Sequence, residues 1–172
     1  LIGGYWHNSV QAVRDIPIPM DEHIIYNFHC YDPLLFTHQG AQWVDDMPAD
    51  YRMEFKGSME DFCAYAKAHL PAKLAGTLSI LDYKGNLDSA YFEDLFADAI
   101  AVAKERDVAL YCGEYGVIEN ADPEDTVLWY KAINEVFVKY GIGRAAWSYK
   151  EMDFDLRADR LKPVFDELKK YF

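Results

Sequence analysis

The strongest constraint on the fold is a repeated order of segments, in which a short apolar run ends in polar side chains and a helical pattern follows. Three runs have the composition of strands, at residues 23–31, 108–116 and 143–150, and residues 1–5 resemble the end of a fourth. Nearly continuous apolar runs are typical of parallel strands that are buried on both faces. Their alternation with helices predicts an α/β fold.

The helical segments carry their own start and stop signals. Asp122-Pro123-Glu124-Asp125 combines a capping residue, a proline at the first helical position and acids in the first turn. Apolar residues then recur at helical spacing as far as Tyr140, where Gly141 follows. Similar patterns predict helices over residues 58–70, 89–106 and 161–171. The aromatic stretch 32–58 lacks a period, which is typical of a functional loop.

Composition excludes several classes of partner. The 172 residues suffice for one compact domain, and the net charge of −12 repels nucleic acid and anionic membranes. No apolar run is long enough for a membrane helix, and no signal peptide opens the chain. Three cysteines without paired spacing predict neither disulfides nor a metal site, and no cofactor is expected. Cys112 is interpreted as a core residue on the same strand face as Glu114.

Polar and aromatic groups gather where the predicted strands end. In barrels of parallel strands the active site lies at these carboxyl ends. A carboxylate at an anomeric carbon, hydroxyl and imidazole groups on ring hydroxyls, and an indole under the ring are what a sugar site needs. The groups, in chain order, are Trp6, Asn8, His29, Tyr31, Glu114 and Trp147. Gly113 and Gly116 flank the carboxylate and allow close backbone approach.

The segments 26–33, 36–41, 113–116 and 146–150 resemble, in order and spacing, glycoside hydrolase family five, the cellulase family of the (β/α)8 clan. The resemblance covers the whole chain and implies the family's strands five to eight. A complete barrel averages about 250 residues. We therefore interpret residues 1–172 as a single half-barrel domain, the C-terminal half of a TIM barrel with four βα units.

The resemblance implies roles for the residues that match its motifs. Glu114 matches the nucleophile, His29 and Tyr31 match the pair that contacts substrate and orients the nucleophile, and Trp147 matches the indole that stacks under the sugar. Further candidates for substrate binding, for which loop anchoring is the alternative, are Trp6, Asn8, His38 and Trp43. The acidic run 151–155 is interpreted as solvated or capping. The family's work on polysaccharide implies a secreted protein.

The acid/base of the family is missing. That residue is a Glu in an Asn-Glu-Pro motif, and Asn134-Glu135, the one Asn-Glu pair here, lies inside a predicted helix and precedes Val136. Three functions stay open: a retaining β-1,4-glucan hydrolase, a half-barrel that binds carbohydrate without cleaving it, and one chain of a split enzyme. Unpaired strand edges at residues 1–5 and 143–149 predict closure by a second copy or by an N-terminal half-barrel chain.

Overall fold

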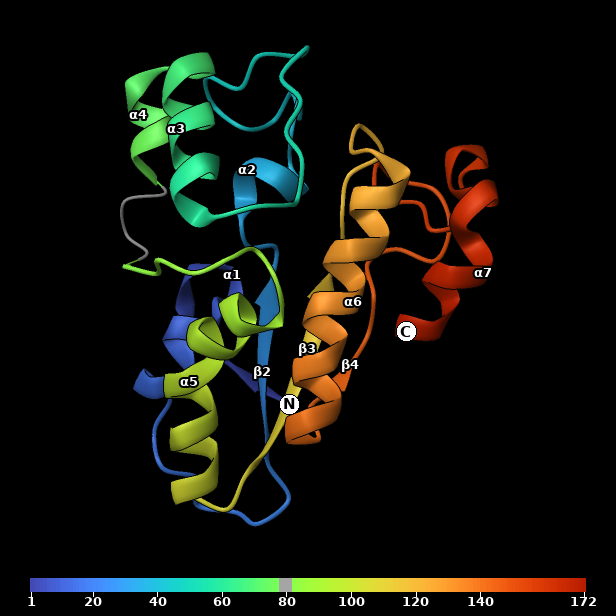
Figure 1. Cartoon of the computed structure of the whole chain (residues 1–172). Coiled ribbons are helices and arrows are strands. Elements are labelled where there is room, and N and C mark those ends of the chain that lie inside the picture. The colour runs from blue at the N-terminus through green and yellow to red at the C-terminus, as the bar shows by residue number, and fades with distance from the viewer. Residues whose placement is uncertain (78–81) are drawn as a thin grey trace.

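The fold is a four-stranded parallel sheet with helices packed on one side, as Figure 1 shows for the computed structural model. The structure describes residues 1–77 and 82–172, except for the side chain of Trp6. The strands run in the order β1 (Ile2–Gly3), β2 (Ile25–Cys30), β3 (Ala109–Tyr115) and β4 (Gly143–Arg144). The predicted α/β class is confirmed, and long strands occupy the centre with two-residue strands at the edges.

Helices α5 (Ser89–Glu105) and α6 (Pro123–Tyr140) flank β3 in the sequence and begin where their capping residues predict. The Asp122 carboxylate accepts hydrogen bonds from the backbone N–H groups of Glu124, at 2.8 Å, and Asp125, at 3.3 Å. Gly141 ends α6 in the left-handed conformation at φ 65°. Both helices are therefore set by local signals in the sequence.

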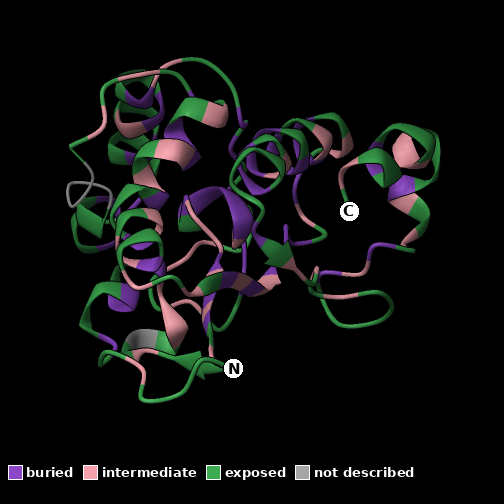
Figure 2. Cartoon of the chain, turned by 90° about the horizontal axis from the view of Figure 1, so that it is seen from below, coloured by how far each residue is buried: buried purple, intermediate pink, exposed green. Residues whose placement is uncertain are grey.

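An aromatic core joins these two helices to the sheet. Phe96 on α5 lies edge-on to Phe28 of β2, with ring centroids 5.1 Å apart, and stacks on Phe137 of α6 at 5.9 Å. Tyr115 of β3 stacks on Trp129 of α6 at 6.2 Å. Figure 2 shows the buried residues gathered where helices and sheet face one another. Burial of these large rings stabilises the contact between the helices and the sheet.

The segment between β2 and α5 forms a helical insertion. It contains α2 (Leu34–Thr37), α3 (Met59–His69) and α4 (Ala72–Ala75), so the helix predicted over 58–70 is confirmed. The aromatic stretch 32–58, which has no sequence period, is connected internally by hydrogen bonds of the buried Gln39 side chain. Its Nε2 donates to the carbonyl oxygens of Phe36 and Met53, and its Oε1 accepts from the Met53 N–H.

Two terminal predictions need correction. The C-terminal helix is broken into η3 (Asp159–Val164), α7 (Phe165–Leu168) and η4 (Lys169–Tyr171), because Pro163 lacks the N–H that a continuous α-helix needs. The strand predicted over 143–150 is only two residues long. Its pairing with β3 continues through single hydrogen bonds, from the Ala145 N–H to the Cys112 carbonyl and from the Trp147 N–H to the Tyr115 carbonyl.

An irregularity between β2 and β3 changes which residues share a face. Phe28 pairs with Cys112, but the next residue, His29, pairs with Glu114, so Gly113 is an extra residue on β3. The alternation of β3 side chains between the two faces of the sheet therefore restarts at Glu114. The expectation that Cys112 shares the face of Glu114 is wrong: Cys112 is fully buried toward the helices, and burial raises the pKa of its thiol.

The opposite face of the sheet is open. Ile25 is 39% exposed on this face, and its partner on β3, Ala109, is exposed as well. Asn27 faces the same way, and its buried Oδ1 has no hydrogen-bond partner among the described residues. Within residues 1–77 and 82–172, β1 and β4 each pair with one neighbour. The remaining elements are α1 (Tyr5–Asn8) and the 3-10 helix η1 (Val10–Asp15), and no described helix could cross a membrane.

We expect Phe96→Ala to lower the free energy of unfolding by about 3–5 kcal/mol, because it removes a fully buried ring that contacts β2 and α6. Phe172→Ala is the matched control, since that ring is 41% exposed. Urea unfolding of the two variants measures the difference. Equal midpoints would contradict the placement of the core.

Candidate functional site

Glu114 lies at the carboxyl end of β3 and is contacted by two side chains from β2 and its end. The Tyr31 hydroxyl donates to Glu114 Oε2 at 3.0 Å. His29 Nδ1 lies 3.4 Å from the same oxygen, and the His29 and Glu114 side chains are 19% and 33% exposed. The three residues predicted as catalytic are therefore brought together, with the carboxylate open to solvent.

The strand register explains this arrangement. His29 and Glu114 are partners across neighbouring parallel strands, so their side chains leave the sheet on the same face. The extra residue Gly113 turns Glu114 to that face. Without it, Glu114 would point toward the helices, as Cys112 does.

Tyr31 is in the correct protonation state to donate. Burial raises the pKa of its phenol, and the neighbouring Glu114 carboxylate raises it further. The hydroxyl consequently stays protonated at neutral pH. The hydrogen bond from the Tyr31 hydroxyl occupies one lone pair of Glu114 Oε2 and holds the carboxylate in one orientation.

His38 supports Tyr31 rather than facing solvent. Its ring lies edge-on to the Tyr31 ring at 5.1 Å. The buried Thr37 hydroxyl donates to the Tyr31 carbonyl and lies 3.0 Å from His38 Nδ1, which therefore donates to it. Burial lowers the pKa of His38 to about 4, so the ring is neutral.

Phe154 completes an aromatic cluster that the sequence did not predict. Its ring centroid lies 5.5 Å from that of Tyr31 and 5.2 Å from that of His38. Trp43 is 6.3 Å from His38 and 54% exposed, so its indole extends the cluster to the surface. Phe154 is 7% exposed, and the interpretation of 151–155 as solvated is wrong at this residue. In the sequence, the feature that could have indicated this burial is a single phenylalanine within the acidic run 151–155.

Trp147 follows β4 and is 39% exposed. The backbone N–H of Trp147 donates to the carbonyl oxygen of Tyr115, the neighbour of Glu114, at 2.8 Å. A Cβ at Gly116 would collide with the Trp147 carbonyl oxygen, so glycine permits this approach. The backbone of Trp147 is thus anchored beside the end of β3 that carries Glu114.

The residues predicted after β1 lie in α1. Asn8 adopts φ 58°, and the next residue, Ser9, forms a parallel bridge with His29. This bridge brings the end of α1 next to the strand that carries His29. The side chain of Trp6 lies outside the described part of the structure. In that part, no three His, Cys, Asp or Glu side chains converge as metal ligands.

Parallel strands that alternate with helices on one side of the sheet, with polar groups at their carboxyl ends, are typical of (β/α) barrels. Within that class, the chain belongs to glycosyl hydrolase family 5, whose cellulase model matches residues 1–153. The resemblance seen in the sequence is confirmed.

Named relatives match over most of this chain. It is 40% identical over 144 residues to cellodextrinase A of Ruminococcus flavefaciens, covering 84% of this chain and 35% of the relative. It is 33% identical over 168 residues to endoglucanase C of Acetivibrio thermocellus, covering 97% of this chain and 48% of the relative. The chain thus spans about a third to a half of the length of these relatives.

Solved structures show the same proportion. The cellulose synthase subunit Z of Clostridioides difficile superposes with a TM-score of 0.70 at 19% identity, covering 96% of this chain and 47% of the other. A hyperthermophilic endo-β-1,4-glucanase superposes with a TM-score of 0.65 at 23% identity, covering 93% and 44%. The fold is therefore half of a TIM barrel.

We expect acid to destabilise the protein through His38. The unfolded chain protonates this residue near pH 6.5, whereas the folded protein does so near pH 4. Stability should fall as the pH drops between these values, by up to about 3 kcal/mol. His38→Gln should remove that part of the pH dependence, measured by urea unfolding from pH 4 to 7.

His23→Gln is the control, because the His23 side chain is 85% exposed. If wild type and His38→Gln lose stability in parallel between pH 6.5 and 4, His38 is not buried as a neutral ring.

Proposed function

We propose that this chain is the nucleophile-bearing half of a retaining β-1,4-glucan hydrolase. The observation that carries the proposal is the convergence of Tyr31 and His29 on one oxygen of Glu114. A carboxylate held in one orientation at the open end of parallel strands is suited to attack an anomeric carbon. In this proposal residues 1–172 form one half-barrel domain.

The first chemical step would use Glu114 directly. The carboxylate oxygen attacks the anomeric carbon and forms a glycosyl-enzyme ester, while the glycosidic C–O bond breaks and its electron pair leaves with the departing oxygen. Water later cleaves the ester and returns Glu114 to its carboxylate form. A poor leaving group must be protonated as it departs, so a second carboxyl group is required for natural substrates.

The substrate proposal rests on the relatives and on the aromatic surface. Their names describe a cellodextrinase and an endoglucanase. The exposed indoles of Trp147 and Trp43 are suited to stack on sugar rings. Trp6, Asn8 and His38 stay candidates for outer contacts, with His38 acting by supporting Tyr31. A polysaccharide substrate also supports a location outside the cell.

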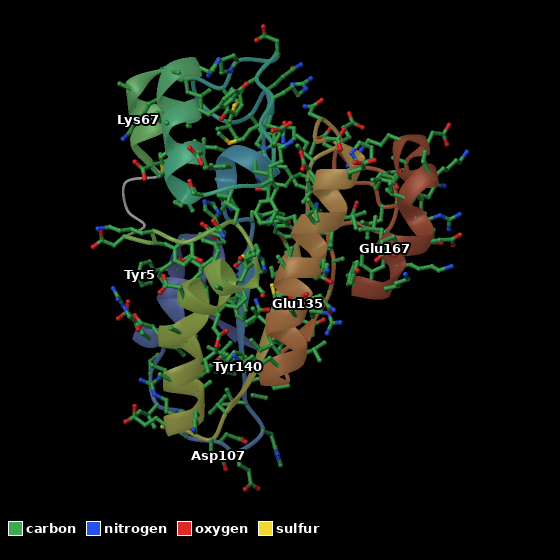
Figure 3. The ribbon with its side chains drawn as sticks, in the orientation of Figure 1. Tyr5, Lys67, Asp107, Glu135, Tyr140 and Glu167 are labelled. Carbon is green, nitrogen blue, oxygen red and sulfur yellow. The ribbon has the colours of Figure 1, made fainter. Side chains whose placement is uncertain are left out.

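The acid/base does not come from the one Asn-Glu pair in the sequence. Glu135 projects from α6, as Figure 3 shows, and is exposed. Asn134 accepts a hydrogen bond from Arg144 Nη2, which explains its presence on that helix. A half-barrel that binds glucan without cleaving it is therefore the second candidate function, and a split enzyme is the third.

We further propose that the open sheet face is covered by a second half-barrel. The exposed partners Ile25 and Ala109 on that face support this. An N-terminal half would add four strands and the missing acid/base. In the isolated chain, a second copy would take its place.

Glu114→Gln should abolish the release of phenolate from dinitrophenyl β-cellobioside. This leaving group needs little acid assistance, so we expect the wild-type chain to give a burst of about one equivalent. The matched control is Glu135→Gln, an exposed carboxylate remote from the strand ends, which should keep the burst. Rapid mixing with absorbance detection measures it.

The outcomes separate the candidates. A burst that survives in Glu114→Gln within about tenfold rejects Glu114 as the nucleophile. No burst in the wild type, with cello-oligosaccharides still bound, leaves the binding half-barrel. If the wild-type chain gives no burst and binds no cello-oligosaccharide, the proposal is overturned.

We expect the isolated chain to sediment as a dimer of about 40 kDa, because two open sheet faces can cover each other. The single chain has a mass of 19.8 kDa. Sedimentation velocity distinguishes these masses. A folded chain near 20 kDa would overturn closure by a second copy.

A further inference from the structure

We propose that the chain carries a second carbohydrate site, which binds a glucan strand away from Glu114. The site is a cavity of about 990 Å³ between the insertion and the start of α6. Its volume lies at the upper end of the range for small-molecule pockets. The proposal rests on the proposed function for the identity of the glucan.

The cavity is separate from the candidate active site. His29, Tyr31 and Glu114 are not among its lining residues, which are Gln39, Arg52, Met53, Glu54, Lys56, Asp61, Phe62, Tyr65, Asn120, Ala121, Asp122, Glu124, Asp125 and Leu128. Asn120 Nδ2 donates to the Gln39 carbonyl at 3.1 Å, which joins two of the segments that line the cavity. Gln39 follows His38 in the chain, so one short loop presents His38 to the Tyr31 site and Gln39 to the cavity.

Tyr65 supplies an aromatic platform. Its ring is 42% exposed and stacks on His69, with centroids 4.0 Å apart and an interplanar angle of 21°. His69 Nδ1 lies 2.8 Å from the Tyr65 carbonyl oxygen, which fixes the stacked pair. Lys67, on the same helix, points away from α6 (Figure 3). His69 covers one face of the Tyr65 ring, so a pyranose would stack on the part of the ring that is left exposed.

The charges favour a neutral ligand. Five acids and two bases line the cavity, so phosphates and other anions are repelled. Several of the carboxylates are already engaged: Glu54 pairs with Lys56 at 2.8 Å, Asp61 accepts from the Ser58 hydroxyl at 2.6 Å, and Asp122 caps α6. In the described part of the chain no such group is arranged for a metal ion.

A neutral ligand rich in hydroxyl groups fits both the polar and the apolar residues that line the cavity. The Glu124 carboxylate and the amide of Asn120 can exchange hydrogen bonds with sugar hydroxyls, while Met53, Phe62 and Leu128 provide apolar contact. A stretch of the same polymer that reaches Glu114 has this chemistry. Binding there would hold the polymer on the protein between cleavage events.

Two variants test the proposal. Tyr65→Ala removes the platform, and Leu128→Arg fills the cavity from α6 without changing Tyr65; the Leu128 side chain is 45% exposed and should tolerate the change. We expect each to weaken binding to soluble mixed-linkage β-glucan about tenfold in affinity electrophoresis, Tyr65→Ala by losing one stacking contact and Leu128→Arg by occupying the cavity. Both should keep the phenolate burst with dinitrophenyl β-cellobioside.

Tyr140→Ala is the matched control, because Tyr140 is 38% exposed at the far end of α6 (Figure 3) and should leave glucan binding unchanged. Wild-type affinity in both Tyr65→Ala and Leu128→Arg would overturn the second site. Loss of the burst in Glu114→Gln, with polymer binding retained, would support two separate sites. A wild type without a burst whose polymer binding still depends on Tyr65 would overturn the catalytic proposal alone.

Discussion

The pairing of β2 with β3 is the interaction on which the rest of the structure depends. It places His29 beside Glu114, and the extra residue Gly113 turns the carboxylate away from the helices. Residues on the other face, such as Phe28 and Tyr115, carry the aromatic packing of α5 and α6. Core stability and site chemistry therefore use opposite faces of the same two strands, so the site can stay open to solvent while the core stays closed.

This division explains how half of a barrel can have a well-packed core. The helices bury their apolar faces against one side of the sheet, and that contact needs nothing from another half. The other side exposes Ile25 and Ala109, where a complete barrel would be filled. One carboxylate with its orienting groups lies on this half. The chain covers 35% and 48% of the length of the two named relatives.

The insertion after β2 links three regions through consecutive residues. Thr37 donates to the Tyr31 carbonyl, His38 packs against the Tyr31 ring, and Gln39 ties the insertion to itself and lines the cavity. A change in this loop would reach the orientation of Glu114 through Tyr31 and the cavity through Gln39. The insertion is thus part of the functional surface in both proposals.

The sequence by itself determined the α/β class, the family, the start of α6 and the positions of Glu114 and His29 at strand ends. Each depends on local chemistry: the cap at Asp122, the composition of a strand, or a short ordered motif. Only the tertiary structure decided that Cys112 faces the helices, that Phe154 packs on Tyr31 and His38, and that Tyr65 borders a cavity. These features follow from strand register and from contacts between segments far apart in the chain. Neither is encoded in the period of any one segment.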